Sequence, residues 1–79
     1  MTALDLTKGE RARITAIKSN DFTCRLLTLG IVPEKTCEIV GISPFGGAKI
    51  LRLDQHLVAL RDEELKSIII EKYKPADHV

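Results

Sequence analysis

The sequence predicts a mostly β fold, a small five-stranded barrel with one α-helix inserted after the first strand. Five short segments rich in β-branched and other apolar residues are separated by turn residues, and one further segment has helical spacing. The 79 residues suffice for a single domain, residues 1–79. Five short strands leave exposed edges in an open sheet, and closing the sheet into a barrel removes those edges.

The first predicted strand covers residues 11–19, RARITAIKS, and follows a turn at Gly9. Ala12, Ile14 and Ala16 fall on one face of this segment. A period of two is typical of a strand that buries one face.

A short helix is predicted next. Asn20 or Asp21 supplies an N-cap oxygen for the first free backbone N–H groups. Gly30 ends the helix, because glycine adopts the left-handed C′ conformation without a Cβ penalty. The apolar residues between them recur at spacings of four and three, as one helix face requires: Phe22, Leu26 and Leu29.

Four more strands are predicted, over residues 36–43, 49–53, 56–60 and 67–73. The third and fourth strands are separated only by Asp54 and Gln55, which is the length of a two-residue hairpin turn. The segment RDEELK suits a single helical turn capped by Asp62. A one-turn helix just before the fifth strand is a feature of SH3-like barrels. Residues 75–79 are expected to form a flexible tail.

Composition argues against several classes of function. Twelve basic and eleven acidic residues give a net charge of +1 and are spread along the chain, so we expect no nucleic-acid partner. No apolar run approaches the roughly 20 residues that span a bilayer, and the first residues lack the layout of a signal peptide. We therefore expect a cytoplasmic protein. Two cysteines, Cys24 and Cys37, form no disulfide framework and are expected to be buried, reduced thiols.

Four segments together resemble the FeoA family, the small cytosolic components of bacterial ferrous-iron uptake systems. They are LDLTKGE, the helix ending RLLTLGIVPE, the loop SPFGGAKILRL and the closing VALRDEELKSIII. The resemblance covers nearly the whole chain. The chain departs from the family pattern at Glu34, where a glycine usually follows the proline. A type II turn favours glycine at that position, so Glu34 indicates either a type I turn or a strained one.

The resemblance implies an SH3-like barrel with an inserted helix, and a non-catalytic accessory or regulatory role in ferrous-iron uptake. The implied partner is the cytosolic region of the membrane transporter FeoB, which carries a GTP-binding domain. The chain would then reach the membrane only through this partner. No nucleophile-elbow or phosphate-loop motif points to an enzyme.

Partner contact is expected from exposed apolar groups with an arginine nearby, as at protein interfaces. Leu27 lies about 100° round the helix from Leu26, so it either widens the buried stripe or is left at its rim. The candidate partner-binding residues are Arg25, Leu26, Leu27, Leu29 and Phe45.

Two alternative functions stay open. The first is a regulator that binds Fe²⁺ or Zn²⁺ directly, although no contiguous metal motif exists and no cofactor is firmly predicted. Its weak candidate ligands are Asp54, His56, Cys24 and Cys37. The second is an SH3-like peptide-binding module. Such modules bind proline-rich peptides in aromatic-lined grooves, and Phe45 is the clearest candidate for that role here. The sequence does not define the oligomeric state or the direction of the effect on transport.

Overall fold

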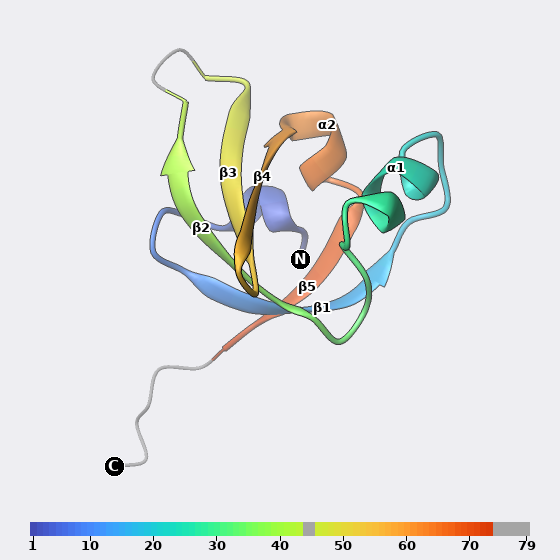
Figure 1. Cartoon of the computed structure of the whole chain (residues 1–79), viewed down its shortest axis with the longest axis horizontal. Helices are drawn as coiled ribbons and strands as arrows, with labels where there is room; N and C mark the ends of the chain where they lie inside the picture. The colour runs from blue at the N-terminus through green and yellow to red at the C-terminus, as the bar shows by residue number, and fades with distance from the viewer. Residues whose placement is uncertain (44–45, 74–79) are drawn as a thin grey trace.

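The computed structural model describes residues 1–43 and 46–73; the predicted tail and Phe45 lie outside this part of the chain. Figure 1 shows five strands and three short helical segments, beginning with a 3₁₀ turn at Ala3–Asp5. The strands and helices are β1 (Arg11–Ile17), α1 (Thr23–Thr28), β2 (Thr36–Ile42), β3 (Ala48–Leu53), β4 (His56–Arg61), α2 (Asp62–Leu65) and β5 (Ile68–Lys72).

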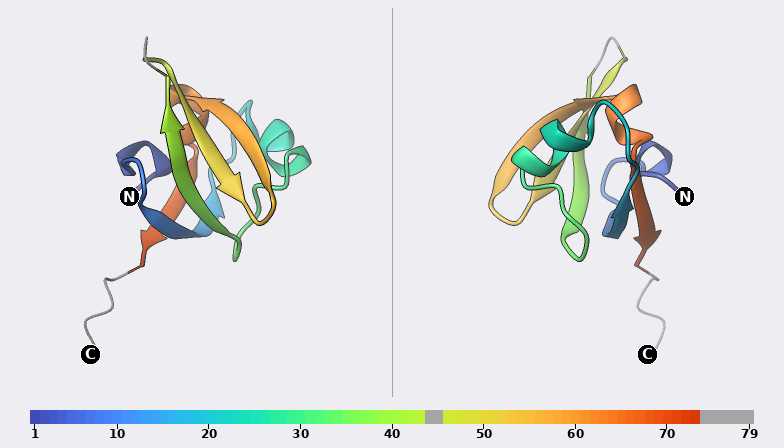
Figure 2. Two further views of the ribbon diagram at one scale, coloured as in Figure 1. Left: turned by 60° about the vertical axis from the view of Figure 1, so that its left-hand side comes forward. Right: turned by 90° about the vertical axis from the view of Figure 1, so that its right-hand side faces the viewer.

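All five strands belong to one antiparallel sheet with the order β4-β3-β2-β1-β5. Figure 2 shows that the sheet is strongly curved, with β1 and β5 turned against β3 and β4. The concave side holds the core, which consists of buried apolar side chains from every strand, from both α-helices and from connecting segments. The largest fully buried ones are Leu6, Ile14, Leu26, Ile31, Ile39, Leu51, Leu53, Leu60, Leu65 and Ile68.

The expected closure of the barrel is wrong: within the described residues no strand pairing joins β4 to β5. The free edge of β5 is instead occupied by the N-terminal segment. Thr2 forms a β-bridge with Ile69, and the Ile70 N–H donates to the Met1 carbonyl at 3.0 Å. Since these bonds satisfy the β5 edge, β5 cannot also pair with β4 at the same positions.

The strand β1 also departs from its predicted alternation. Ala12 and Ile14 are buried as expected, but Ala16 is exposed. The β1–β5 pairing shifts register between Ile14 and Ala16, which identifies a bulge. A bulge adds one residue and reverses the face of everything after it, so Ile17 packs against the core in place of Ala16.

The predicted two-residue hairpin is present, because Leu53 pairs directly with His56. Asp54 has a positive φ of 51°. Its carboxylate accepts a hydrogen bond from the Lys35 ammonium at 2.6 Å. Positive φ at the first central position matches a type II′ turn, whose twist suits a hairpin.

The helix α1 ends as predicted on Gly30, which has φ 89°. The Gly30 N–H donates to the Leu27 carbonyl and the Ile31 N–H to the Leu26 carbonyl, both at 3.0 Å. These two bonds define a Schellman motif. Both apolar partners of the motif, Leu26 and Ile31, are fully buried. The helix end is therefore anchored in the core.

Two capping predictions need correction. The side-chain oxygen of Asn20 accepts from the Phe22 N–H at 2.8 Å, so Asn20 stabilises the turn before α1, and the N-cap position itself belongs to Phe22. In α2 the N-cap is Arg61 and not Asp62. The carboxylate of Glu64 reaches back to the Arg61 N–H at 3.0 Å, as in half of a capping box.

The turn before β2 adopts the strained alternative. The Lys35 N–H donates to the Val32 carbonyl at 3.3 Å across Pro33 and Glu34, and Glu34 has φ 81°. Proline first and positive φ second are the pattern of a type II turn. The Glu34 N–H donates to the Ile14 carbonyl at 2.7 Å. The turn is thus fixed against β1 although glycine is absent.

Glu10 predicts a pH-dependent contribution to stability. The Thr7 N–H donates to its Oε1 at 2.7 Å and the Lys72 ammonium lies 3.0 Å from its Oε2. The bond from Thr7, followed by that from Lys72, lowers the pKa of Glu10 from 4.5 to about 2. A carboxyl group whose pKa is lower in the folded state stabilises the fold only while ionised, so this contribution is complete above pH 4.5 and is lost between 4.5 and about 2.

The variant Glu10→Gln should therefore lose less stability than the wild type as the pH falls through that window. Urea unfolding at a series of pH values measures the difference. Between about pH 6 and 7 the gap between the two proteins should be constant, because the carboxyl group is ionised in both states. Parallel curves below pH 4.5 would contradict the proposed contacts.

Candidate interaction site

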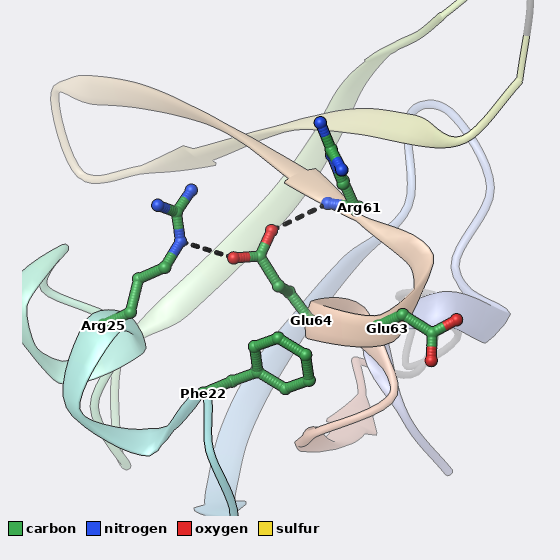
Figure 3. Close-up of a pocket in the computed structure, with 5 residues that line it drawn as sticks. All are labelled: Phe22, Arg25, Arg61, Glu63 and Glu64. Atoms are coloured by element: carbon green, nitrogen blue, oxygen red, sulfur yellow. Dashed lines mark hydrogen bonds and ion pairs between the residues drawn. The ribbon is translucent and has the colours of Figure 1, made fainter.

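The candidate site is a pocket between α1 and α2 that contains an ion pair with a buried carboxylate. The two helices lie side by side at one end of the curved sheet (Figures 1 and 2). An open pocket of about 410 Å³ separates the two helices. Figure 3 shows the side chains that line it: Phe22, Arg25, Arg61, Glu63 and Glu64. A pocket of this size falls in the range of ordinary ligand sites.

Glu64 is the centre of this pocket. Its side chain is only 7% exposed. One carboxylate oxygen accepts from the Arg61 backbone N–H at 3.0 Å, and the other forms an ion pair with the Nε of Arg25. A carboxylate at this depth needs both charge compensation and hydrogen bonds, and the two contacts supply them. The ion pair also ties α1 to α2.

Phe22 forms the apolar wall of the pocket. It is partly buried and packs against the hydrophobic core, so its ring is fixed from behind. Figure 3 shows the ring on one side of the Glu64 carboxylate and the two guanidinium groups on the other. The Glu63 carboxylate points away from both guanidinium groups. The arrangement combines an aromatic surface with two cationic groups and can bind an anion that has an apolar neighbour.

The predicted partner-binding residues separate into surface and core. Arg25 has a side chain 58% exposed, and Leu27 is 45% exposed. Leu26 has no exposed surface, and Leu29 is partly buried against the core. Since Leu26 lies between Arg25 and Leu27 on the helix, the two exposed side chains flank the buried stripe. Direct contact with a partner is therefore open to Arg25 and Leu27, and closed to Leu26.

The four candidate metal ligands do not converge. Cys24 is exposed on α1, contrary to the expectation that both thiols are buried. Cys37 is buried in β2, and burial raises the pKa of its thiol to about 11. Asp54 is held by Lys35, which lowers the pKa of the Asp54 carboxyl. The His56 Nε2 lies 3.3 Å from the Leu29 carbonyl.

Cys37 is thus buried in the core, and Asp54 and His56 each contact a group other than a candidate ligand. Across residues 1–43 and 46–73 there is no group of three or more His, Cys, Asp or Glu residues close enough to hold an ion. A tetrahedral zinc site needs about four ligands. The side chains that the structure describes do not fit a resident Fe²⁺ or Zn²⁺ site.

The described aromatic residues do not form a single groove. Phe22 lines the pocket between the helices, whereas Tyr73 directly follows β5. The Tyr73 hydroxyl shares a 2.9 Å hydrogen bond with the Thr36 hydroxyl, and the Arg11 guanidinium lies 5.8 Å from the centre of the Tyr73 ring. A second, smaller pocket of about 220 Å³ lies over β1, β2 and β3. Its lining is mostly charged and contains no aromatic residue: Arg11, Thr36, Cys37, Glu38, Arg52 and Asp54. These positions do not favour proline-rich peptides, which require adjacent aromatic side chains.

Sequence reasoning missed Phe22, Arg61, Glu63 and Glu64 as neighbours of Arg25. One local signal was available, because Glu64 stands three residues after the N-cap of α2, the position of the glutamate in a capping box. The pairing of Glu64 with Arg25, 39 residues earlier, had no such signal. It depends on how the curved sheet brings α1 beside α2.

Comparison with known families and structures identifies the chain's relatives. A family model described as the FeoA domain matches residues 1–72. A search of curated proteins found no match. No helix in the described part of the chain is long and apolar enough to cross a bilayer.

Solved structures show the same fold. Iron(II) transport protein A from Clostridium thermocellum is 29% identical with a TM-score of 0.84, covering 91% of this chain and 45% of that chain. The FeoA-like protein from Clostridium acetobutylicum is 22% identical with a TM-score of 0.89, covering 100% and 93%. Stenotrophomonas maltophilia FeoA, solved with zinc and described as a prokaryotic SH3 domain protein, is 22% identical with a TM-score of 0.79, covering 90% and 89%. This chain spans less than half the length of the first of these.

Proposed function

The chain belongs to the FeoA family, and from this premise we propose that it is a non-catalytic accessory protein of ferrous-iron transport that acts by binding the cytosolic part of a FeoB-type transporter. The match over residues 1–72 and the likeness to an iron(II) transport protein support the transport role. In this proposal the protein works in the cytosol and reaches the membrane only through its partner. Iron is the cargo of the system and not a resident cofactor of this chain.

One observation carries the binding proposal: α1 keeps an apolar side chain in solvent next to its buried stripe. Leu27 is 45% exposed, although the preceding Leu26 is fully buried. Interfaces use apolar anchors accompanied by arginine, and Arg25 lies on the other flank of Leu26. We therefore assign partner contact to Arg25 and Leu27, while Leu26 and Leu29 hold the helix in place.

Titration of the purified protein against the transporter's cytosolic GTP-binding domain tests the proposal, with and without guanine nucleotide. Leu27→Asp should weaken binding at least tenfold, because a charge would replace an apolar anchor. Leu57→Asp is the matched control, since Leu57 is an exposed leucine on β4, 60% exposed against 45% for Leu27. Absence of binding in every nucleotide state, together with normal iron uptake after deletion of the gene, would refute the proposal.

A further inference from the structure

The Arg25 side chain is held in a fixed orientation that leaves its two Nη groups free. Its Nε forms the ion pair with the buried carboxylate of Glu64. Neither of its two Nη atoms has a hydrogen-bond partner among residues 1–43 and 46–73. A guanidinium group fixed through Nε presents its two Nη groups as a planar fork, the geometry that binds a carboxylate with two parallel hydrogen bonds. Because Glu64 fixes the fork in advance, less side-chain entropy is lost on binding.

Arg61 supplies a second guanidinium group on the same side of the pocket. Only its backbone N–H contacts Glu64, at 3.0 Å. Its side chain lines the pocket and forms no hydrogen bond or ion pair within the described part of the chain. Figure 3 shows both guanidinium groups on the side of the Glu64 carboxylate opposite Phe22, and both arginines are exposed. Glu64 pairs with Arg25, and the Glu63 carboxylate, although it also lines the pocket, points away from both guanidinium groups, so the Arg61 guanidinium has no paired carboxylate among the lining residues.

We propose that this pocket binds a carboxylate side chain of the partner protein, an aspartate or glutamate placed between Arg25 and Arg61. An apolar residue next to that carboxylate would pack on the Phe22 ring. The inference rests on the proposed function for the identity of the partner, and it adds the chemistry that the partner must present. Charge complementarity and the adjoining aromatic wall favour an acidic protein segment over a free anion, which would leave Phe22 without a contact.

The test compares three variants in the same titration. Arg61→Gln removes one guanidinium group and leaves the backbone contact to Glu64 intact, so folding is expected to be unchanged. It should weaken binding of the transporter's cytosolic domain about tenfold. The double variant Arg25→Gln/Arg61→Gln should weaken it further and reduce the salt dependence of binding. Arg11→Gln/Arg52→Gln removes the same charge from the second pocket and should change affinity less than about twofold.

Lysine variants separate shape from charge. Arg25→Lys/Arg61→Lys keeps both charges but loses the planar fork, and it should bind nearly as weakly as the glutamine double variant. Full affinity in the lysine variant would refute bidentate recognition. If the glutamine variants of Arg25/Arg61 and of Arg11/Arg52 lose affinity equally, the proposed site is refuted, because only non-specific electrostatic attraction would then explain binding. A loss seen only with bound nucleotide would mean that the arginines contact phosphate, which would also overturn the proposal.

The outcome for this inference is distinct from that for the proposed function. If the wild type binds and Leu27→Asp fails to bind, but Arg61→Gln binds normally, the proposed function stands and the carboxylate site is wrong. If the wild type does not bind at all, the proposed function itself is wrong.

Discussion

Replacing Leu26 by alanine is expected to lower the free energy of unfolding by about 2–5 kcal/mol, the range for large-to-small changes in a well-packed core. Leu26 has no exposed surface, and its carbonyl accepts the Ile31 N–H in the motif that ends α1. A cavity at this position would loosen both the core and the helix end. In a domain of this size the loss is a large fraction of the total stability.

Leu27→Ala is the matched control, since it changes the same residue type one position further along α1. Leu27 is 45% exposed, so its truncation should cost less than about 1 kcal/mol. Urea or thermal unfolding measures both variants. Equal losses would mean that α1 is rotated about its axis relative to the structure described. In partner binding the order should reverse: Leu27→Ala should weaken binding more than Leu26→Ala, because Leu27 is the proposed contact.

The second large effect is expected at Glu34, through a comparison of two variants. Glu34→Ala and Glu34→Gly both lose the 2.8 Å contact between Arg13 and Glu34. They differ in how well each tolerates φ 81°. A left-handed conformation costs a residue with a Cβ about 1–2 kcal/mol, while glycine loses about 0.4–1 kcal/mol more backbone entropy on folding. The glycine variant should therefore be more stable than the alanine variant by about 1 kcal/mol.

Chemical denaturation of both variants at one pH measures this difference. Glu34→Gln serves as a third variant that keeps the Cβ and a polar end but loses the charge. It should resemble alanine more than glycine. If the alanine variant is the more stable of the two, the turn adopts φ < 0 in solution and the type II geometry is incorrect.

The sequence correctly predicted features that depend only on residues close together in the chain. The left-handed Gly30 and the Leu53–His56 hairpin are both set by neighbouring residues, and both were predicted. The bulge after Ile14 was not, because it arises from pairing with β5, more than 50 residues later. Closure of the barrel was predicted from the general need to protect edges, and it is wrong because the segment at Thr2 protects β5 instead.

The candidate site was predictable only in part. The helical spacing correctly placed Arg25 and Leu27 beside the buried stripe. It could not show that Glu64 pairs with Arg25. That contact joins α1, which lies between β1 and β2 in the chain, to α2, which lies between β4 and β5. Cys24 was expected inside and is exposed, because the buried stripe of a six-residue helix is too narrow to include it.

The N-terminal segment on β5 has a consequence for self-association. Met1 and Thr2 occupy the backbone groups of Ile69 and Ile70, and the Lys49 ammonium secures the same segment by hydrogen bonds to the Leu4 and Leu6 carbonyls at 2.9 and 2.7 Å. An unpaired strand with three consecutive isoleucines is a template for a strand from another molecule. We therefore expect that a protease cut or a deletion within residues 1–6 would expose the β5 edge and favour association between molecules.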